Sequence, residues 1–408
     1  MSAIGCGQAE TLAALREKRS GIGPVKYLET SLRDFPVGEV KLSNAELAAR
    51  TGAPETWPRT TLLSILALQE ALAQASISME GKAFPSTKKQ ADASRNAFPS
   101  QNRMPAALTL VSGTTVGGMD LSEQLYPAYS PWHSCGASTD LAAHFLGFSH
   151  ATTLSTACSS AANAFIYAAN LIRCGLADRV VAGGAESLSD YHLNGFNSLM
   201  ILDREWCRPF DAGRAGLNLG EGAAFLVLET EESALERGAK PIAVLSGWGN
   251  ACDAFHQTAS SENGEGAFLA MSQALKVAGL KPSQIDYVNA HGTGTPNNDA
   301  SESTALRRIF GDGIPPVSST KPYTGHTTSA SGSIEAVFCL LAMQHGFLPP
   351  QLNWKEADPA CVTPYRSFGL RPQDDKCHSE RSEESLRHIL SNAFGFGGND
   401  TSFILSRV

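Results

Sequence analysis

Apolar runs with the spacing of strands alternate with runs that have the spacing of helices along most of the chain. In the first half they lie at 106–114, 159–175, 177–187 and 220–238. The second half repeats the order at 241–250, 264–280, 285–295, 315–326 and 331–346. This alternation predicts an α/β protein with buried, partly parallel strands. We expect two similar halves, residues 1–238 and 239–408, that meet near residue 240.

Two polar segments interrupt this pattern and are predicted to be solvated insertions. Residues 81–103 contain the sequence AFPS twice, and residues 374–388 are similarly polar and charged. Cys377, His378 and Glu380 in the second segment have metal-binding side chains, but no second group of ligands accompanies them. We therefore expect no metal site.

Composition narrows the classes of function. The 408 residues are 42% hydrophobic and 18% charged, which is typical of a globular protein with a large core. The formal net charge of −8 and the lack of a basic stripe argue against a nucleic-acid surface. The nine cysteines form no CxxC pair and no secretion signal opens the chain, so we expect reduced thiols in the cytoplasm.

One long uncharged segment raises the question of a membrane span. Residues 141–172 contain no Asp, Glu, Lys or Arg. Ser, Thr, Asn and His are spread along the segment, so we interpret it as buried protein core and expect no span.

Cys158 lies inside this segment, where a strand-like run becomes an alanine-rich helical run, TTLSTACSSAANAF. A thiol at the start of a helix is close to the positive end of the helix dipole, which favours the nucleophilic thiolate. Small residues after it allow other elements to approach the helix closely. Taken alone, the position favours a buried structural cysteine, because free cysteine is among the most buried residue types.

Further polar clusters follow other strand-like runs. VNAHGTGTPNND (288–299) carries a histidine and two hydroxyl groups, and SSTKPYTGHTTSASGSIEAV (318–337) carries a lysine, a second histidine and a glutamate. Each alone is consistent with a turn or a solvated loop. Together with Cys158 they indicate a ligand site, because the carboxyl ends of strands are where open α/β sheets bind ligands.

The last cluster, SNAFGFGGND (391–400), sets two phenylalanines among three glycines. Glycine-rich backbone can turn its amides toward an oxyanion, and a phenylalanine between glycines can act as a gate. The simpler interpretation is a hairpin turn before the final strand.

The motifs STACSS, NAHGTGTPNND, SSTKPYTGH and NAFGFGG, in this order, closely resemble the β-ketoacyl-[acyl carrier protein] synthases of the decarboxylating, chain-elongating type, in the thiolase superfamily. The resemblance implies a thiolase-like five-layered αβαβα sandwich made of two similar halves. It also implies a homodimer, or a heterodimer with a related synthase subunit. No cofactor of its own is implied, because the phosphopantetheine arm arrives on the acyl carrier protein.

The same resemblance implies a role for each residue of the clusters. Cys158 would accept the acyl chain as a thioester. His291 and His326 would hydrogen-bond the malonyl thioester carbonyl and promote loss of CO2. The remaining roles are a charge-balancing pair (Lys321 and Glu335), an oxyanion hole (the backbone N–H groups of Cys158 and Phe394), a gate (Phe396) and hydrogen bonds to the pantetheine arm (Thr293 and Thr295).

Several departures from the family pattern qualify this reading. Met1 falls where related synthases have already completed a first strand, so we expect an interior strand of the N-terminal half to be missing and the protein to be destabilised. Ser329 replaces a glycine, GGND stands where GGTN is common, and residues 374–388 replace an expected strand.

Three functions follow from these observations. The first is a condensing enzyme of fatty acid or polyketide biosynthesis, including the aryl polyene type. The second is a non-catalytic chain-length partner subunit, or a truncated inactive copy. The third, an unrelated Cys-His hydrolase, is disfavoured because it leaves Lys321 and a second histidine unexplained.

Overall fold

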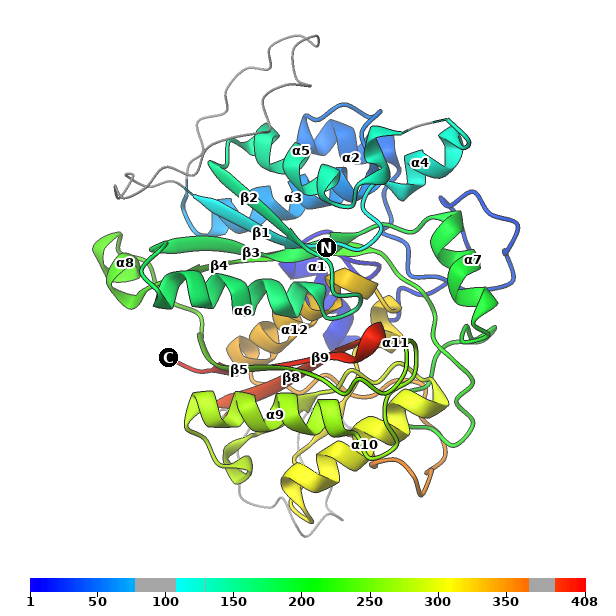
Figure 1. Cartoon of the computed structure of the whole chain (residues 1–408), viewed down its shortest axis with the longest axis vertical. Coiled ribbons are helices and arrows are strands. Elements are labelled where there is room, and N and C mark those ends of the chain that lie inside the picture. Colours follow the sequence, from blue (N-terminus) through cyan, green and yellow to red (C-terminus); the bar gives the residue numbers. More distant parts are fainter. Residues whose placement is uncertain (78–107, 129, 367–385) are drawn as a thin grey trace.

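The computed structural model describes residues 1–77, 108–128, 130–366 and 386–408. Two sheets form its framework (Figure 1). The first has the order β2-β1-β3-β4 and consists of β1 (Thr109–Gly113), β2 (His150–Leu154), β3 (Arg179–Glu186) and β4 (Gly222–Glu229). The second has the order β5-β9-β8-β6-β7 and consists of β5 (Val244–Cys252), β6 (Tyr287–Asn289), β7 (Val317–Ser318), β8 (His388–Gly395) and β9 (Asn399–Ser406).

The two sheets have the same topology in four of their strands. In the first, β1 is parallel to β2 and β3, and β4 is antiparallel to β3. In the second, β6 is parallel to β7 and β8, and β9 is antiparallel to β8. The second sheet continues with β5, which pairs with β9, whereas the described residues place no full strand beside β4.

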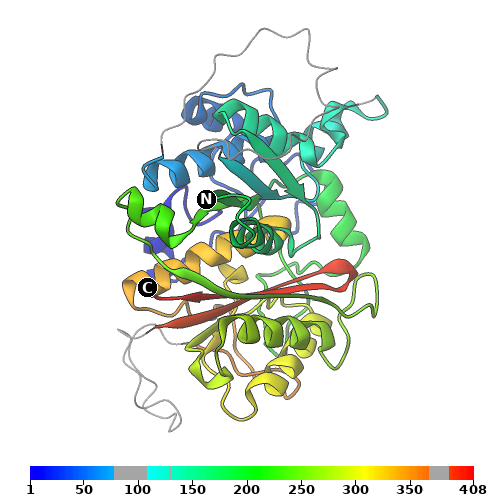
Figure 2. The same cartoon turned by 60° about the vertical axis from the view of Figure 1, so that its left-hand side comes forward.

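Helices cover both faces of each sheet and produce five layers (Figures 1 and 2). The outer face of the first sheet carries α2 (Asn44–Thr51), α3 (Arg59–Gln74) and α5 (Gly136–Leu146). Between the sheets lie α6 (Ser160–Arg173) and α12 (Ser331–His345), and the outer face of the second sheet carries α9 (Glu265–Ala278) and α10 (Pro296–Phe310). The fold is therefore the predicted thiolase-like αβαβα sandwich.

Shorter helices connect these layers. They are α1 (Gln8–Arg16), α4 (Met119–Leu125), α7 (Asp190–Ser198), α8 (Glu231–Glu236) and α11 (Lys321–Thr324). Among the described residues, none of the helices is both long and apolar enough to cross a membrane.

Small residues bring the central helices close together, as the alanine-rich sequence after Cys158 predicts. A Cβ atom on Gly332 of α12 would lie 2.9 Å from the backbone nitrogen of Ala162 in α6. A Cβ on Gly113 at the end of β1 would lie 2.5 Å from the nitrogen of Ala161. Because no side chain fits at either contact, α6 packs directly against both β1 and α12.

Two sequence expectations need correction. The strand before the gate loop is present as β8, which begins at His388 and pairs with β6 and β9. The backbone N–H groups of Arg387 and His388 donate to the Asp286 carboxylate at 2.8 and 2.9 Å, so polar residues lead directly into the strand. The first sheet has the continuous order β2-β1-β3-β4, so the expectation of a missing interior strand is wrong for the part of the chain that the structure describes. The insertion 81–103 and residues 374–385 lie outside the described residues.

Candidate active site

Cys158 lies in the turn between β2 and α6, immediately before the helix N-cap residue Ser159. The preceding residue, Ala157, has φ 51°, a left-handed conformation that is strained for alanine and fixes the direction of the turn. The Cys158 side chain is buried with 5% of its surface exposed. The turn therefore presents the thiol to the interior between the two halves.

The predicted thiolate is wrong for this resting site. Burial raises the pKa of Cys158 to about 12, although the Lys321 charge and the backbone N–H groups of Phe396 and Cys158 act in the opposite direction. Desolvation therefore outweighs the helix dipole and the nearby cation. The thiol is protonated at neutral pH and needs a base when it reacts.

His326 is the side chain in direct contact with that thiol. Its Nε2 lies 3.0 Å from Cys158 Sγ, and its Nδ1 lies 2.9 Å from the Ser331 hydroxyl. Burial and then the charge of Lys321 lower the pKa of His326 well below its ordinary value. The imidazole is therefore neutral, which allows it to accept a proton at one nitrogen.

His291 lies beside His326, with the ring centroids 5.3 Å apart and the planes at 82°. Its backbone N–H donates to Glu302 at 2.9 Å, which fixes the turn after β6. Burial and then Lys321 lower the pKa of His291 well below its ordinary value. Its Nδ1 is buried without a hydrogen-bond partner among the described residues.

Lys321 and Glu335 form a buried ion pair behind the histidines. Lys321 Nζ donates to Glu335 Oε1 at 2.7 Å and to the backbone carbonyl of His291 at 2.5 Å. Both side chains are almost fully buried. The pair joins the start of α11 to α12 and holds one positive charge close to both imidazoles.

The gate loop approaches Cys158 from the turn between β8 and β9. The backbone N–H of Phe396 hydrogen-bonds the Cys158 sulfur, whereas Phe394 lies within β8 with its ring 5.6 Å from that of His291. The assignment of the oxyanion amide to Phe394 is therefore corrected to Phe396. The Phe396 ring stacks on Phe196 with centroids 5.7 Å apart.

Thr293 and Thr295 lie in the loop between β6 and α10, close to His291 in sequence. Their hydroxyl groups are 2.9 Å apart, and the Thr293 N–H donates to Asp299 at 3.1 Å. The structure thus places every predicted residue of the 288–299 cluster on the same loop.

Three nearby residues escaped the sequence analysis. Ser331 is bound to His326, Phe196 stacks on the gate, and the His192 ring lies 5.1 Å from Phe196. Burial lowers the pKa of His192 to about 4, and its Nδ1 has no hydrogen-bond partner in the described parts of the chain. Of the three, only Ser331 could have been found in the sequence, because it lies five residues after His326, in the first turn of a predicted helix.

Ser329, the predicted departure from the family pattern, is buried and donates to Glu186 Oε2 at 2.5 Å. The same carboxylate accepts from the Thr114 hydroxyl and from backbone N–H groups of the turn after β1. Ser329 therefore links the start of α12 to the first sheet without entering the cysteine and histidine cluster.

No group of three or more His, Cys, Asp and Glu side chains in the described ranges is arranged to hold a metal ion. Cys377, His378 and Glu380, the metal-binding side chains noted in the sequence, lie outside those ranges.

Comparisons with known proteins agree with this geometry. Two family profiles match, Beta-ketoacyl synthase, N-terminal domain, over residues 59–234 and Beta-ketoacyl synthase, C-terminal domain, over residues 242–355. Nodulation protein E of Rhizobium meliloti is 34% identical over 96% of this chain and 93% of its own length. The 3-oxoacyl-[acyl-carrier-protein] synthase 2 of Rhizobium meliloti (strain 1021) is 39% identical over 73% of this chain and 71% of its own length.

Among solved structures, the ishigamide ketosynthase/chain length factor superposes with a TM-score of 0.83. It is 29% identical, and the match covers 100% of this chain and 96% of that one. The likeness thus extends over both sheets and all four motifs.

Proposed function

This chain belongs to the β-ketoacyl synthase family of condensing enzymes, and we propose that it catalyses decarboxylative Claisen condensation on an acyl carrier protein. An acyl group on Cys158 would react with malonyl-[acyl carrier protein] to give 3-oxoacyl-[acyl carrier protein] and CO2. The observation that carries the proposal is the contact of Cys158 Sγ with His326 Nε2 at 3.0 Å, with His291 beside them.

The first step transfers the acyl group to Cys158. As the sulfur attacks the thioester carbonyl, His326 Nε2 accepts the thiol proton and passes it to the departing pantetheine thiolate. A new C–S bond forms, the old one breaks, and His326 returns to its neutral state. The high pKa of the Cys158 thiol makes this base assistance necessary.

Two backbone N–H groups are available to the oxyanion of that step. Those of Cys158 and Phe396 both point at the sulfur in the resting site. When the acyl carbon bonds to the sulfur, its carbonyl oxygen becomes the oxyanion and would lie within reach of both donors, which need no reorganisation because the turns hold them in place.

In the second step the malonyl group loses CO2. The bond between its carboxylate and the α-carbon breaks, and the electron pair forms an enolate whose oxygen accepts hydrogen bonds from His291 and His326. The enolate carbon attacks the acyl carbonyl, the C–S bond to Cys158 breaks, and the thiolate takes up one proton. Two neutral imidazoles suit this role because each carries one N–H. His326 ends the first step with its proton on Nδ1, so it must shift to the Nε2–H tautomer before it donates to the enolate.

Lys321 and Glu335 support the histidines through charge. The ammonium of Lys321 disfavours protonation of both rings, and its bond to the His291 carbonyl holds that loop. Glu335 balances the buried cation. We assign both residues positioning roles.

The phosphopantetheine arm is part of the substrate, and we propose that Thr293 and Thr295 hydrogen-bond it beside His291. The partner is an acyl carrier protein, and the molecule works as a homodimer or beside a related synthase subunit. The reduced thiols favour the cytoplasm as the site of action.

A second candidate is a non-catalytic chain-length subunit. The ketosynthase/chain length factor pair among the similar structures supports it. The contact between Cys158 and His326 favours the catalytic subunit, since a non-catalytic subunit has no need of a thiol held against a neutral imidazole.

The test is product formation from purified acyl-carrier and malonyl-carrier proteins, read as the mass of the 3-oxoacyl carrier. The parent should form it, and the Cys158→Ala variant should not. A parent that forms no product, alone or with a related subunit, contradicts the catalytic proposal.

A further inference from the structure

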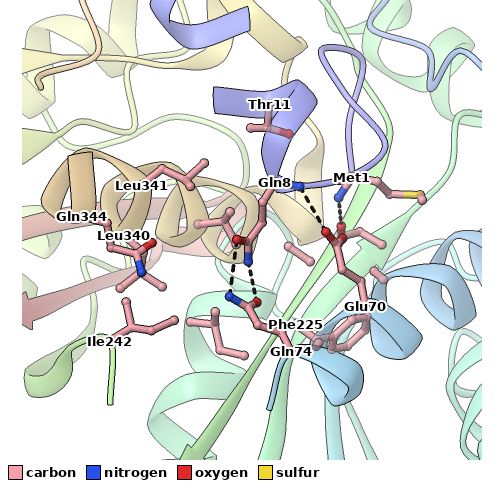
Figure 3. Close-up of a pocket in the computed structure, with 17 residues that line it drawn as sticks. Met1, Gln8, Thr11, Glu70, Gln74, Phe225, Ile242, Leu340, Leu341 and Gln344 are labelled. Atoms are coloured by element: carbon pink, nitrogen blue, oxygen red, sulfur yellow. Dashed lines mark hydrogen bonds between the residues drawn. The ribbon is translucent and has the colours of Figure 1, made fainter. Parts of the chain in front are cut away.

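The thiol of Cys158 is covered in the resting molecule, with 5% of its surface exposed. A hollow between α3 and α12, crossed by the side chains of Gln8 and Gln74, lies elsewhere (Figure 3). Its lining, in the part of the chain that the structure describes, includes neither Cys158 nor a histidine. Because the sulfur is buried, a substrate reaches it only after a segment that covers it has moved.

One covering segment is the gate loop, residues 396–398, between β8 and β9. The backbone N–H of Phe396 hydrogen-bonds the Cys158 sulfur. Just before the loop, a Cβ atom on Gly395 would lie 2.8 Å from the carbonyl oxygen of Thr156. No side chain fits there, so the loop begins in direct contact with the turn that carries the nucleophile.

Asn399, the residue after the gate loop, joins that loop to the nucleophile turn. Its Oδ1 accepts hydrogen bonds from the Ser159 hydroxyl and from Asn163 Nδ2, both at 2.7 Å. Ser159, which directly follows Cys158, shares its one hydroxyl proton with the Thr156 carbonyl, also at 2.7 Å. Asn163 has two N–H donors, so it can bond Asn399 at full strength. One side-chain oxygen therefore connects the end of the gate loop to both the nucleophile turn and α6.

Asn163 holds Asn399 within a larger network of side chains. Its second N–H donates to Thr156 Oγ1 at 2.9 Å. Its Oδ1 accepts from Asn250 Nδ2 at 2.9 Å and from the Thr401 hydroxyl at 3.1 Å. Both donors and both acceptor positions of the Asn163 amide are then occupied. Because its partners come from the nucleophile turn, β5 and β9, this amide fixes Asn399 relative to both halves of the molecule.

Asn399 is one of the departures of this chain from the family pattern, because it stands in GGND where GGTN is common. A threonine hydroxyl is attached to the Cβ atom, whereas Oδ1 of asparagine lies one bond further from the backbone. The longer side chain reaches Ser159 and Asn163 on the other half of the molecule. The asparagine thus gives this chain a longer-reaching acceptor at the end of its gate loop than the common sequence has.

We propose that Asn399 is a positioning residue that holds the gate loop closed over Cys158 and keeps the Phe396 N–H directed at the sulfur. Its hydrogen bonds break when a substrate enters and form again before the oxyanion appears. The part of this proposal that concerns the reaction rests on the proposed function, whereas the closure of the loop does not. Loss of the Asn399 side chain should raise the fraction of molecules with an open loop about tenfold.

Loop opening can be measured without a substrate, as the rate at which iodoacetamide alkylates each thiol, read by peptide mass spectrometry. We expect Asn399→Ala to raise the rate at Cys158 about tenfold, and Asn399→Thr, which keeps a shorter acceptor, to raise it less. Cys207 is the internal control, because it is also buried and burial raises its pKa to about 12 as well, so its rate should not change. The control variant Asn263→Ala, at an exposed position of the same half, should match the parent at both thiols.

A kinetic measurement at saturating carrier protein separates the two steps of the reaction. Asn399→Ala should slow acyl transfer to Cys158 about tenfold, because the oxyanion donor is less well held. It should change CO2 release by preformed acyl-enzyme by less than about twofold, because the histidines hold the enolate.

Unchanged alkylation of Cys158, an equal rise at Cys207, or equal rates of acyl transfer in Asn399→Ala and the parent would overturn the proposal. Equal slowing of acyl transfer and CO2 release would also overturn it. A parent that acquires no acyl group would contradict the proposed function alone, and alkylation would still test the closure of the loop.

Discussion

The sulfur of Cys158 lies 3.0 Å from Nε2 of His326, although 168 positions separate the two residues in the chain. Cys158 follows β2 of the first sheet and His326 follows β7 of the second, so the contact exists only when the two halves are packed together. It combines a protonated thiol with a neutral imidazole.

His326 acts in both steps and His291 only in the second, so their alanine variants should differ in the rate of acyl transfer. His326→Ala removes the base, so we expect the rate of acyl transfer to Cys158 to fall by about 100- to 10,000-fold. His291→Ala leaves the thiol contact in place, so acyl-enzyme should still form while CO2 release falls by about 100- to 1,000-fold. Stopped-flow mixing with mass detection of the acyl-enzyme separates the steps. Equal loss of both steps in both variants would contradict this division of roles.

Ser331 should act through His326. Ser331→Ala removes the hydrogen bond to Nδ1, and the loss of about 1 kcal/mol predicts roughly fivefold slower acyl transfer. Ser331→Thr keeps a hydroxyl group and should restore most of the rate. A melting temperature equal to that of the parent would separate this positioning effect from unfolding, and an unchanged rate in Ser331→Ala would rule it out.

Breaking the buried ion pair should cost more than removing it. Lys321→Met leaves Glu335 buried without its cation and should lower the free energy of unfolding by on the order of 3 to 5 kcal/mol at pH 8. Burial raises the pKa of Glu335, so the carboxyl is neutral in this folded variant at lower pH, and the deficit should shrink toward pH 5.

The double variant Lys321→Met/Glu335→Gln is the matched control for that prediction. It contains no buried charge at this position, so its stability should exceed that of Lys321→Met at pH 8 and change little with pH. Denaturant unfolding at both pH values measures the difference. A double variant less stable than Lys321→Met would contradict the charge argument.

The buried carboxyl of Asp400, next to the gate loop, should make the stability of the protein depend on pH. Burial, and then Asp253 and Glu302, raise the pKa of this carboxyl to about 8. The folded state therefore holds a proton that the unfolded state releases near pH 4, so stability falls as pH rises between these values. Asp400→Asn should leave stability unchanged at pH 4 and raise it by on the order of 5 kcal/mol at pH 8, since each of the roughly four pH units contributes about 1.4 kcal/mol.

The control for that prediction is Asp312→Asn, at an exposed position. This variant should follow the parent at every pH. If Asp400→Asn also follows the parent from pH 4 to pH 8, the Asp400 carboxyl is ionised throughout and the prediction is wrong.

Much of the fold was predictable because strands that are buried on both faces have continuous apolar sequences, bounded by small and polar residues. The runs at 106–114 and 177–187 became β1 and β3, and the segment 331–346 became α12. The strand before the gate loop was missed because the charged residues up to Arg387 concealed the start of β8 at His388. The polarity of a sequence segment does not by itself show where a strand begins, because the strands that pair with it also decide its limits.

The motifs were enough to predict which residues form the site, but not the protonation state of Cys158 or the amide that faces its sulfur. Burial decides the pKa of Cys158, and burial depends on residues from both halves that no local pattern contains. The oxyanion amide was misassigned because Phe394 and Phe396 share one glycine-rich sequence. The left-handed turn at Gly397, with φ 83°, follows Phe396 and marks where β8 has ended and the loop toward Cys158 begins. The roles of the site residues and the division at residue 238 stay predictions.

The most direct test of the account is intact-protein mass spectrometry of a single turnover. The protein is first incubated with acyl-loaded carrier protein, separated from excess carrier, and then mixed with malonyl-loaded carrier protein. We predict an acyl mass that maps to Cys158 and disappears as an equal amount of 3-oxoacyl carrier forms. A folded sample that acquires no acyl group on Cys158, or whose acyl group persists after malonyl carrier is added, would contradict the account.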